Sequence, residues 1–317
     1  MSFILLIVGF CFLIKGADVF VDGAASIARK FNVPAMIIGL TIVAMGTSAP
    51  EAAVSITSSL AGQNDMSVAN VVGSNFFNIL MVLGVSSIIV KLPVDKNTIK
   101  KDAPFLIFAS AMMLLFASDL RMTRVEGLLF LVMFAYFLFT TIKSAKTLSM
   151  ESETNSGENA AAIETASTEE ISMPKTIFVS LLGVVGIVLG GDMVVNSATS
   201  IATSFGMSAN LVGLTIVAIG TSLPEFVTSI VAIKKGETDI AIGNVIGSNL
   251  FNILLVLGLA TTINPISISM LALIDVCFMV FITILLYLFM KKNSLVKAQG
   301  FVLVALYVLY MSYTILR

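Results

Sequence analysis

Long apolar stretches follow one another along almost the whole chain, with short polar segments between them. Many are close to the ~20 residues that a helix needs to cross the hydrocarbon core of a bilayer. Hydropathy and the positions of Gly and Pro predict ten spans. These cover residues 3–21, 34–60, 67–90, 103–118, 124–142, 175–196, 208–233, 239–263, 268–290 and 298–316. The pattern therefore predicts an all-α, polytopic membrane protein with ten transmembrane helices.

One segment does not fit this pattern. Residues 143–174 are rich in Ser, Thr, Ala and Glu, with six glutamates and no basic residue between Lys146 and Lys175. Such a segment cannot bury enough apolar surface to fold by itself. We expect a flexible cytoplasmic linker that separates a first unit, residues 1–142, from a second, residues 175–317.

The two units carry the same sequence motifs. Residues 31–51 read FNVPAMIIGLTIVAMGTSAPE, and residues 205–225 read FGMSANLVGLTIVAIGTSLPE. Residues 70–84 read NVVGSNFFNILMVLG, and residues 244–258 read NVIGSNLFNILLVLG. Every matched pair is separated by 174 positions without a gap. Each repeat holds five predicted spans, so the second copy must enter the membrane from the opposite side. The sequence thus predicts two inverted five-helix repeats, an architecture typical of transporters.

Basic residues predict the orientation. If the N-terminus lies outside, 14 of the 18 Lys and Arg residues fall in inward-facing loops. Only Arg121, Arg124 and Arg317 fall in outward-facing segments, and Lys15 lies within a span, where we expect it to pair with Asp18 three residues on. Because cytoplasmic loops are enriched in Lys and Arg, both termini are predicted to be outside.

Composition narrows the chemistry further. The chain is 57% hydrophobic and 12% charged, with a mean hydropathy of +1.03, which excludes a water-soluble enzyme. It contains no His, so imidazole metal sites and His-based catalysis are excluded. Cys11 and Cys277 lie in apolar stretches and are expected to be packed as small hydrophobes. The net charge of −1 argues against a nucleic-acid partner.

Two carboxylates lie well inside apolar segments, Glu51 and Glu225. An ionisable group at that depth is costly and indicates a functional site. The alternative is a buried ion pair, but no Lys or Arg occurs within residues 31–84 or 205–233. We therefore interpret both glutamates as functional.

Each glutamate follows a predicted helix break. Pro50 and Pro224 lack an amide proton and clash with the carbonyl four residues back, that of Gly46 and Gly220. We expect these breaks to free carbonyls in residues 44–47 and 218–221, which would need cations or water. Ser48 with Glu51, and Ser222 with Glu225, also match a helix capping box.

The second motif of each repeat supplies more oxygen ligands. Ser74 and Asn78, like Ser248 and Asn252, are four residues apart and so share one helix face. Helix packing is the lesser alternative for the two serines, whereas Phe77 and Phe251 are expected to fill the core. Carboxylates, hydroxyls, amides and carbonyls are hard donors that favour Ca²⁺ or Na⁺ over Zn²⁺ or Cu²⁺. Two glutamates neutralise one Ca²⁺, or share several Na⁺ with neutral oxygens, but cannot do both at once.

The paired motifs GTSAPE/GSNFFN and GTSLPE/GSNLFN resemble the two repeats of the calcium/cation antiporter superfamily, particularly its prokaryotic sodium/calcium exchangers. The resemblance covers nearly the whole chain. It implies that Glu51 and Glu225 bind Ca²⁺ together with backbone carbonyls, and that Na⁺ sites surround them. The implied carbonyl ligands of Ca²⁺ are those of Thr47 and Thr221. The implied Na⁺ ligands are Ser48, Ser222, Ser74 and Ser248, with the carbonyls of Ala44 and Ala218. Asn78 matches the family's amide.

Asn252 departs from relatives that have Asp there, which argues against the K⁺-dependent branch. The expected function is therefore exchange of about three Na⁺ for one Ca²⁺ across the cell membrane, with net charge movement. Exchange of Ca²⁺ for H⁺, or for Na⁺ with K⁺, is the nearest alternative, and a cation channel is a more remote one. No cofactor is expected, and the transported ions and the lipid bilayer are the expected partners. The protein is not expected to be an enzyme, and it is expected to be a monomer, with an oligomer as the alternative.

Overall fold

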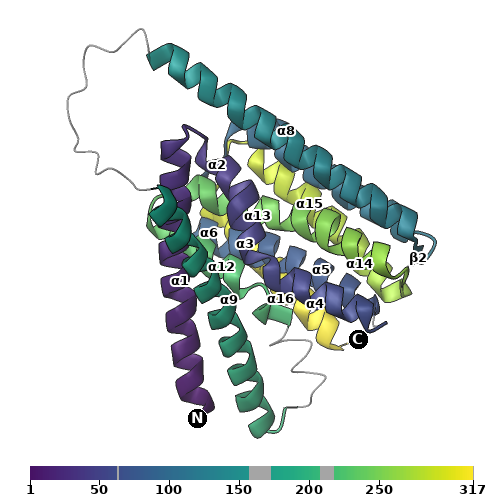
Figure 1. The fold of residues 1–317 in the computed structure, drawn as a ribbon. Coiled ribbons are helices and arrows are strands. Elements are labelled where there is room, and N and C mark those ends of the chain that lie inside the picture. The colour runs from purple at the N-terminus through teal and green to yellow at the C-terminus, as the bar shows by residue number, and fades with distance from the viewer. Residues whose placement is uncertain (63, 157–172, 208–217, 317) are drawn as a thin grey trace.

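The computed structural model describes residues 1–62, 64–156, 173–207 and 218–316, and it is almost entirely helical (Figure 1). The α-helices of the first half are α1 (Ser2–Lys30), α2 (Ala35–Ile38), α3 (Ala44–Thr47), α4 (Ala49–Leu60), α5 (Asn64–Phe76), α6 (Leu83–Ile89), α7 (Ala103–Ala117) and α8 (Arg124–Ser156). Those of the second half are α9 (Met173–Ser204), α11 (Ala218–Gly220), α12 (Leu223–Lys234), α13 (Thr238–Leu250), α14 (Leu257–Ile263), α15 (Met270–Met290) and α16 (Lys297–Leu316). The π-helical segments are η1 (Gly39–Val43), η2 (Phe77–Val82), η3 (Thr98–Asp102) and η5 (Phe251–Val256).

The described helices confirm a multi-pass membrane protein. Seven are long and apolar enough to cross a bilayer, and the bent pair of residues 35–47 and 49–60 raises the number to eight. Most boundaries follow the sequence prediction, although α1 and α9 extend nine and eight residues beyond the predicted ends of their spans, to Lys30 and Ser204. The first part of the predicted span 208–233 lies outside the described residues.

The repeat seen in the sequence is present in the structure. Helices α4 and α12, α5 and α13, and α6 and α14 begin and end at positions that differ by 174, and so do η2 and η5. Four two-residue strands, β1 (Leu92–Pro93), β2 (Arg121–Met122), β3 (Ile266–Ser267) and β4 (Ser294–Leu295), pair between the halves. Strand β1 pairs with β4, and β2 pairs with β3, both antiparallel. Equivalent elements thus make reciprocal contacts, so the two repeats assemble into one body.

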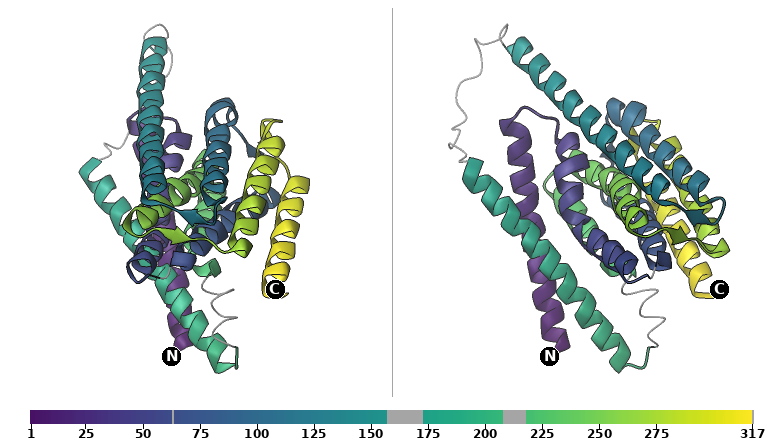
Figure 2. Two further views of the ribbon diagram at one scale, coloured as in Figure 1. Left: turned by 90° about the vertical axis from the view of Figure 1, so that its right-hand side faces the viewer. Right: turned by 45° about the vertical axis from the view of Figure 1, so that its right-hand side comes forward.

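Helices α1 and α9 form a pair at one edge of this body and pack along much of their length (Figures 1 and 2). Glycines allow their backbones to meet. A Cβ atom added at Gly16 would lie 2.7 Å from the carbonyl oxygen of Gly183, and one at Gly183 would lie 2.8 Å from that of Gly16. Small residues at such crossings are the usual means of close helix packing in membranes.

The predicted helix breaks are present beside the two glutamates. Ser48 separates α3 from α4, and the axis bends there by 49°. In the second repeat Thr221 and Ser222 separate α11 from α12. The helices that follow contain the π-helical turns η2 and η5, a deviation often found at functional sites. Breaks and π-turns together bring irregular backbone to the centre of the fold.

Helix α8 corrects one expectation about the linker. It continues to Ser156, so residues 143–156 are helical where a flexible segment was expected. The reason is local, because Ala, Lys, Leu, Met and Glu favour helix and residues 143–156 contain no Gly or Pro. Residues 157–172 lie outside the described part.

The two cysteines also differ from the sequence prediction that they are packed inside the protein. Cys11 in α1 and Cys277 in α15 are exposed rather than packed inside the protein. A helix that is apolar all round does not reveal which face meets lipid and which meets protein. Phe77 and Phe251 are buried as expected, with the Phe251 ring centroid 4.9 Å from that of Phe134.

Candidate functional site

Glu51 and Glu225 lie in the first turns of α4 and α12, and both side chains are completely buried. The amide groups at a helix N-terminus stabilise a nearby negative charge. Each carboxylate also lies within hydrogen-bond distance of the serine three residues before the other glutamate. The structure therefore places the predicted acids inside the protein and next to each other, not against lipid.

The serine of each break binds the glutamate of the other repeat. Ser48 Oγ donates a hydrogen bond to Glu225 Oε1 at 2.8 Å, and Ser222 Oγ donates to Glu51 Oε1 at 3.2 Å. Neither serine side chain caps its own helix, so the capping-box interpretation is wrong. The hydroxyls instead satisfy carboxylates brought close by the crossing of the two broken helices.

Ser74 and Asn252 extend this cluster. Ser74 Oγ donates to Glu51 Oε1 at 3.3 Å and lies 2.9 Å from Ser222 Oγ. Asn252 Nδ2 donates to Ser74 Oγ at 3.0 Å. Asn252 of η5 is therefore linked to the carboxylate of Glu51 through Ser74 of α5.

The remaining predicted ligands lie around the cluster. Thr47 Oγ1 donates to Asn244 Oδ1 at 3.0 Å and lies 3.5 Å from Ser248 Oγ. Asn78 is linked to α13, because its Nδ2 donates to Asn249 Oδ1 at 3.2 Å.

The carbonyls at the breaks differ from the expectation. That of Ala44 is engaged, because it accepts the amide of Ser48 at 3.0 Å. In the second repeat the amide of Ser222 bonds to the carbonyl of Ile219 at 3.1 Å, one residue beyond Ala218. A three-residue turn therefore replaces the four-residue bond of the first repeat. Thr221 contributes a buried hydroxyl without a partner among the described residues.

Sequence reasoning missed Asn70 and Asn244. Asn70 Nδ2 donates to the carbonyl of Glu51 at 3.2 Å and to Ser55 Oγ at 2.9 Å. Asn244 Nδ2 donates to the carbonyl of Glu225 at 3.4 Å and to Ser229 Oγ at 3.1 Å. Each amide fastens the glutamate's own helix to the next one. The signal was present, since each Asn opens the repeated motif NV-x-GSN.

Several buried polar atoms at this centre have no hydrogen-bond partner among the described residues. They include one carboxylate oxygen each of Glu51 and Glu225 and the amide oxygens of Asn78 and Asn252. An unpartnered buried acceptor costs about 1–3 kcal/mol, more if it is charged. These four acceptors, two of which belong to the acids themselves, are chemically suited to hard cations, which take oxygen ligands.

Comparison with known proteins decides the family. The family model described as "Sodium/calcium exchanger protein" matches residues 1–143 and 175–316. The chain belongs to this family. Its two matched segments coincide with the two sequence repeats, so the whole helical body is accounted for.

Individual relatives agree with this assignment. The exchanger is 31% identical to the sodium/calcium exchanger MaX1 of Methanosarcina acetivorans, over 98% of this chain and 97% of that one. It is 44% identical to the putative antiporter CaxA of Alkalimonas amylolytica, over 83% and 81% of the two chains. The solved structure of the sodium-calcium exchanger NCX_Mj, soaked with Na⁺ and Ca²⁺, superposes with a TM-score of 0.83 at 30% identity, covering 98% of this chain and 97% of that one.

Proposed function

We propose that this protein is a secondary active antiporter that exchanges Na⁺ for Ca²⁺ across the cell membrane by alternating access. The observation that carries the proposal is the reciprocal pair of bonds from Ser48 to Glu225 and from Ser222 to Glu51. These bonds join two buried acids from equivalent positions into one cluster. Family membership and the names of the relatives support the same function.

Shared acids provide the coupling. Two carboxylates neutralise one Ca²⁺, so Na⁺ ions that occupy the same oxygens must displace it. Exchange of three Na⁺ for one Ca²⁺ moves one net positive charge inward with Na⁺. That charge gains about 2.3 kcal/mol per 100 mV of inside-negative potential, which favours Ca²⁺ extrusion.

The ligand assignment follows the family resemblance. Glu51 and Glu225 would bind Ca²⁺ with the carbonyls of Thr47 and Thr221, and Na⁺ would use the surrounding serines and asparagines. The carbonyl of Ala44 accepts the amide of Ser48 and also the hydroxyl of Thr47 at 3.3 Å, so Na⁺ would compete with the Thr47 hydroxyl for this oxygen. Asn252 is neutral, and we expect no requirement for K⁺.

The proposed architecture is ten transmembrane helices in two inverted repeats. Five helices per repeat would make the second copy enter from the opposite side, and the distribution of Lys and Arg favours both termini outside and residues 143–174 in the cytoplasm. The exact 174-residue correspondence between α4 and α12 supports this arrangement.

The test is Ca²⁺ uptake into liposomes that contain the purified protein. An outward Na⁺ gradient is expected to drive accumulation of Ca²⁺, and an ionophore that collapses this gradient is expected to abolish it. Gradients of K⁺ or of pH alone are expected to drive none. Uptake driven by a pH gradient but not by Na⁺ would establish the proton-coupled alternative, and Ca²⁺ entry without any counter-ion gradient would indicate a channel.

A further inference from the structure

Four buried asparagines form two reciprocal pairs where α5 and η2 meet α13 and η5. Asn78 Nδ2 donates to Asn249 Oδ1 at 3.2 Å, and Asn252 Nδ2 donates to Asn75 Oδ1 at 3.1 Å. All four side chains are at most 1% exposed. Each pair thus joins an amide that is a predicted ligand to one that is not.

The pairing fixes the direction of the predicted ligand. An amide side chain has its donors on one end and its acceptor on the other. With Nδ2 held by a partner, the oxygens of Asn78 and Asn252 must point elsewhere, and both remain without a hydrogen-bond partner among the described residues. Such buried acceptors require an explanation, and a bound cation provides one.

We infer that Asn75 and Asn249 are positioning residues, which hold the amide oxygens of Asn252 and Asn78 toward the transported cation without contacting it. This inference rests on the proposed function. It extends the site by two residues whose contribution is orientation rather than ligation.

The test measures Ca²⁺ binding to purified protein by calorimetry, with Na⁺ as competitor. Asn75→Leu removes the acceptor at similar volume and is expected to weaken Ca²⁺ binding about tenfold. Met279→Leu is the control, because Met279 contacts the other end of Asn75 through sulfur. Normal affinity in a folded Asn75→Leu protein would overturn the inference.

A second variant keeps the inference testable if Asn75→Leu does not fold. Asn75→Asp keeps the Oδ1 acceptor, so it is expected to bind Ca²⁺ with no more than about threefold loss. A tenfold loss in that variant would also overturn the inference. Wild-type protein that binds no Ca²⁺ would contradict the proposed function itself.

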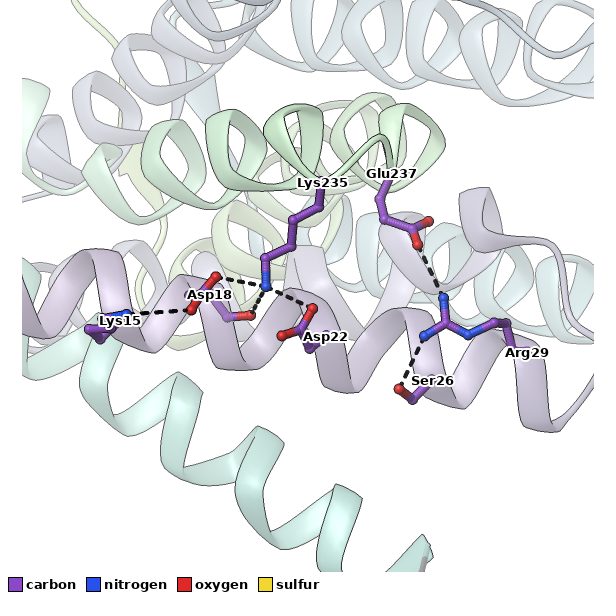
Figure 3. Close-up of polar contacts among 7 residues, drawn as sticks. All are labelled: Lys15, Asp18, Asp22, Ser26, Arg29, Lys235 and Glu237. Atoms are coloured by element: carbon purple, nitrogen blue, oxygen red, sulfur yellow. Dashed lines mark hydrogen bonds and ion pairs between the residues drawn. The ribbon is translucent and has the colours of Figure 1, made fainter. Parts of the chain in front are cut away.

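A different observation concerns the turn that follows α12. Lys235 Nζ lies 2.7 Å from Asp18 Oδ1 and 2.7 Å from Asp22 Oδ1, and it donates to the carbonyl of Asp18 at 2.8 Å (Figure 3). Two residues further along, Glu237 Oε1 lies 3.3 Å from Arg29 Nη1. These contacts fasten the turn to α1 at two points.

Helix α1 covers one of two equivalent helix faces. It packs along α12, where Leu223, Val227 and Val231 are at least partly buried. The equivalent residues of α4 are Ala49, Ala53 and Thr57, and all three are exposed. Among the described residues, α1 therefore packs on α12 while the equivalent residues of α4 are left uncovered, and we refer to this arrangement as closed along α12 and open along α4.

The charged residues of these contacts are mostly replaced by neutral residues in the other repeat. Across the 174-residue offset only Asp18 keeps its charge, as Asp192. The equivalent residues are Ala61 for Lys235, Asn196 for Asp22, Thr203 for Arg29 and Gln63 for Glu237. A conformation with α9 placed over α4, as alternating access between inverted repeats requires, would gain no similar ion pairs.

We propose that Lys235, Asp18 and Asp22 form a one-sided latch that favours the conformation closed along α12 over the one closed along α4. The proposal rests on alternating access. Lys235 is 23% exposed, whereas Asp18 and Asp22 are 40% and 67% exposed, so water and salt partly screen both ion pairs and their effect on the equilibrium is modest. An equilibrium between the two conformations shifts by the free energy of interactions present in only one of them.

The latch is tested by cysteine labelling with a water-soluble maleimide in detergent, which needs no transport. In a background lacking Cys11 and Cys277, Thr57→Cys reports on the α4 face and Val231→Cys on the α12 face. Adding Lys235→Gln is expected to slow labelling at position 57 and to speed it at position 231, each by about threefold to tenfold. Lys234→Gln removes one positive charge at the neighbouring residue and is expected to change neither labelling rate.

The opposite signs distinguish a latch from general destabilisation. Unchanged rates in Lys235→Gln, or two rates that rise together, would overturn the proposal. Because labelling does not depend on ion coupling, a failed transport assay would leave this result interpretable and would count only against the proposed function.

Discussion

Glu51→Gln and Glu225→Gln are each expected to lower Ca²⁺ transport by at least about 100-fold. Gln keeps the size of Glu and one acceptor oxygen for Ser222 or Ser48, but it removes one of the two charges. Two unit charges about 4 Å apart interact with about 4 kcal/mol at an effective dielectric constant near 20. That energy corresponds to about a thousandfold in affinity, so a 100-fold loss is a lower expectation.

The same variants are expected to fold normally. A buried charge without a counter-ion is costly, so its removal leaves the ion-free protein at least as stable as the wild type. Ca²⁺ raises the melting temperature of a protein that binds it only when folded, and this rise is expected to disappear in both variants.

The measurements are Ca²⁺ uptake into liposomes and thermal unfolding with and without Ca²⁺. Asp119→Asn, which neutralises an exposed acid in the turn before β2, is the matched control and is expected to behave like the wild type. Wild-type uptake in either glutamine variant, with Ca²⁺ stabilisation retained, would remove that glutamate from the ion site.

Much of the fold and the two acids at the centre of the site could be predicted, because a membrane restricts both the structures that can span it and the positions where charged residues are tolerated. The 174-residue offset predicted the equivalent helices, and Pro50 and Pro224 predicted the breaks beside the glutamates. The position of Glu51 and Glu225 in apolar segments, with no Lys or Arg nearby in sequence, predicted that both are functional. These inferences depend on local sequence and on the cost of polar groups in lipid.

Partners that come together only in three dimensions could not be predicted. The sequence around Ser48 is suited to capping its own helix, yet its hydroxyl donates a hydrogen bond to Glu225, 177 residues away. Asp18 was expected to pair with Lys15, and that pair is present at 3.8 Å, but Lys235 lies much closer. A residue's sequence context gives its chemistry, whereas the packing of distant helices decides which neighbour uses it.

Gly183→Leu is expected to reduce the yield of folded protein severely. Transport by the fraction that still folds is expected to fall by more than about tenfold. A Cβ atom at this position would lie 2.8 Å from the carbonyl oxygen of Gly16 and 3.0 Å from the amide of Phe20, both backbone atoms. Neither can move without separating α1 from α9. Overpacking of this kind costs about 1–3 kcal/mol or more, and in a membrane the helices have little hydrophobic drive to reassociate.

The position of α1 makes this crossing important for function as well as for stability. Helix α1 carries Asp18 and Asp22 to Lys235 and packs along α12, the helix that holds Glu225 in its first turn. A shift of α1 would disturb all of these contacts together. Gly183→Ala adds a single methyl group and is expected to give an intermediate loss.

The control lies one residue away on α9. Leu182 is 53% exposed on the outer surface, so Leu182→Phe adds bulk without meeting α1 and is expected to keep the wild-type melting temperature and uptake. Melting temperature in detergent and Ca²⁺ uptake at equal protein content are the measurements. If Gly183→Leu melted and transported like Leu182→Phe, α1 and α9 would not meet through their backbones, and the one-sided cover that α1 provides over α12 would need another explanation.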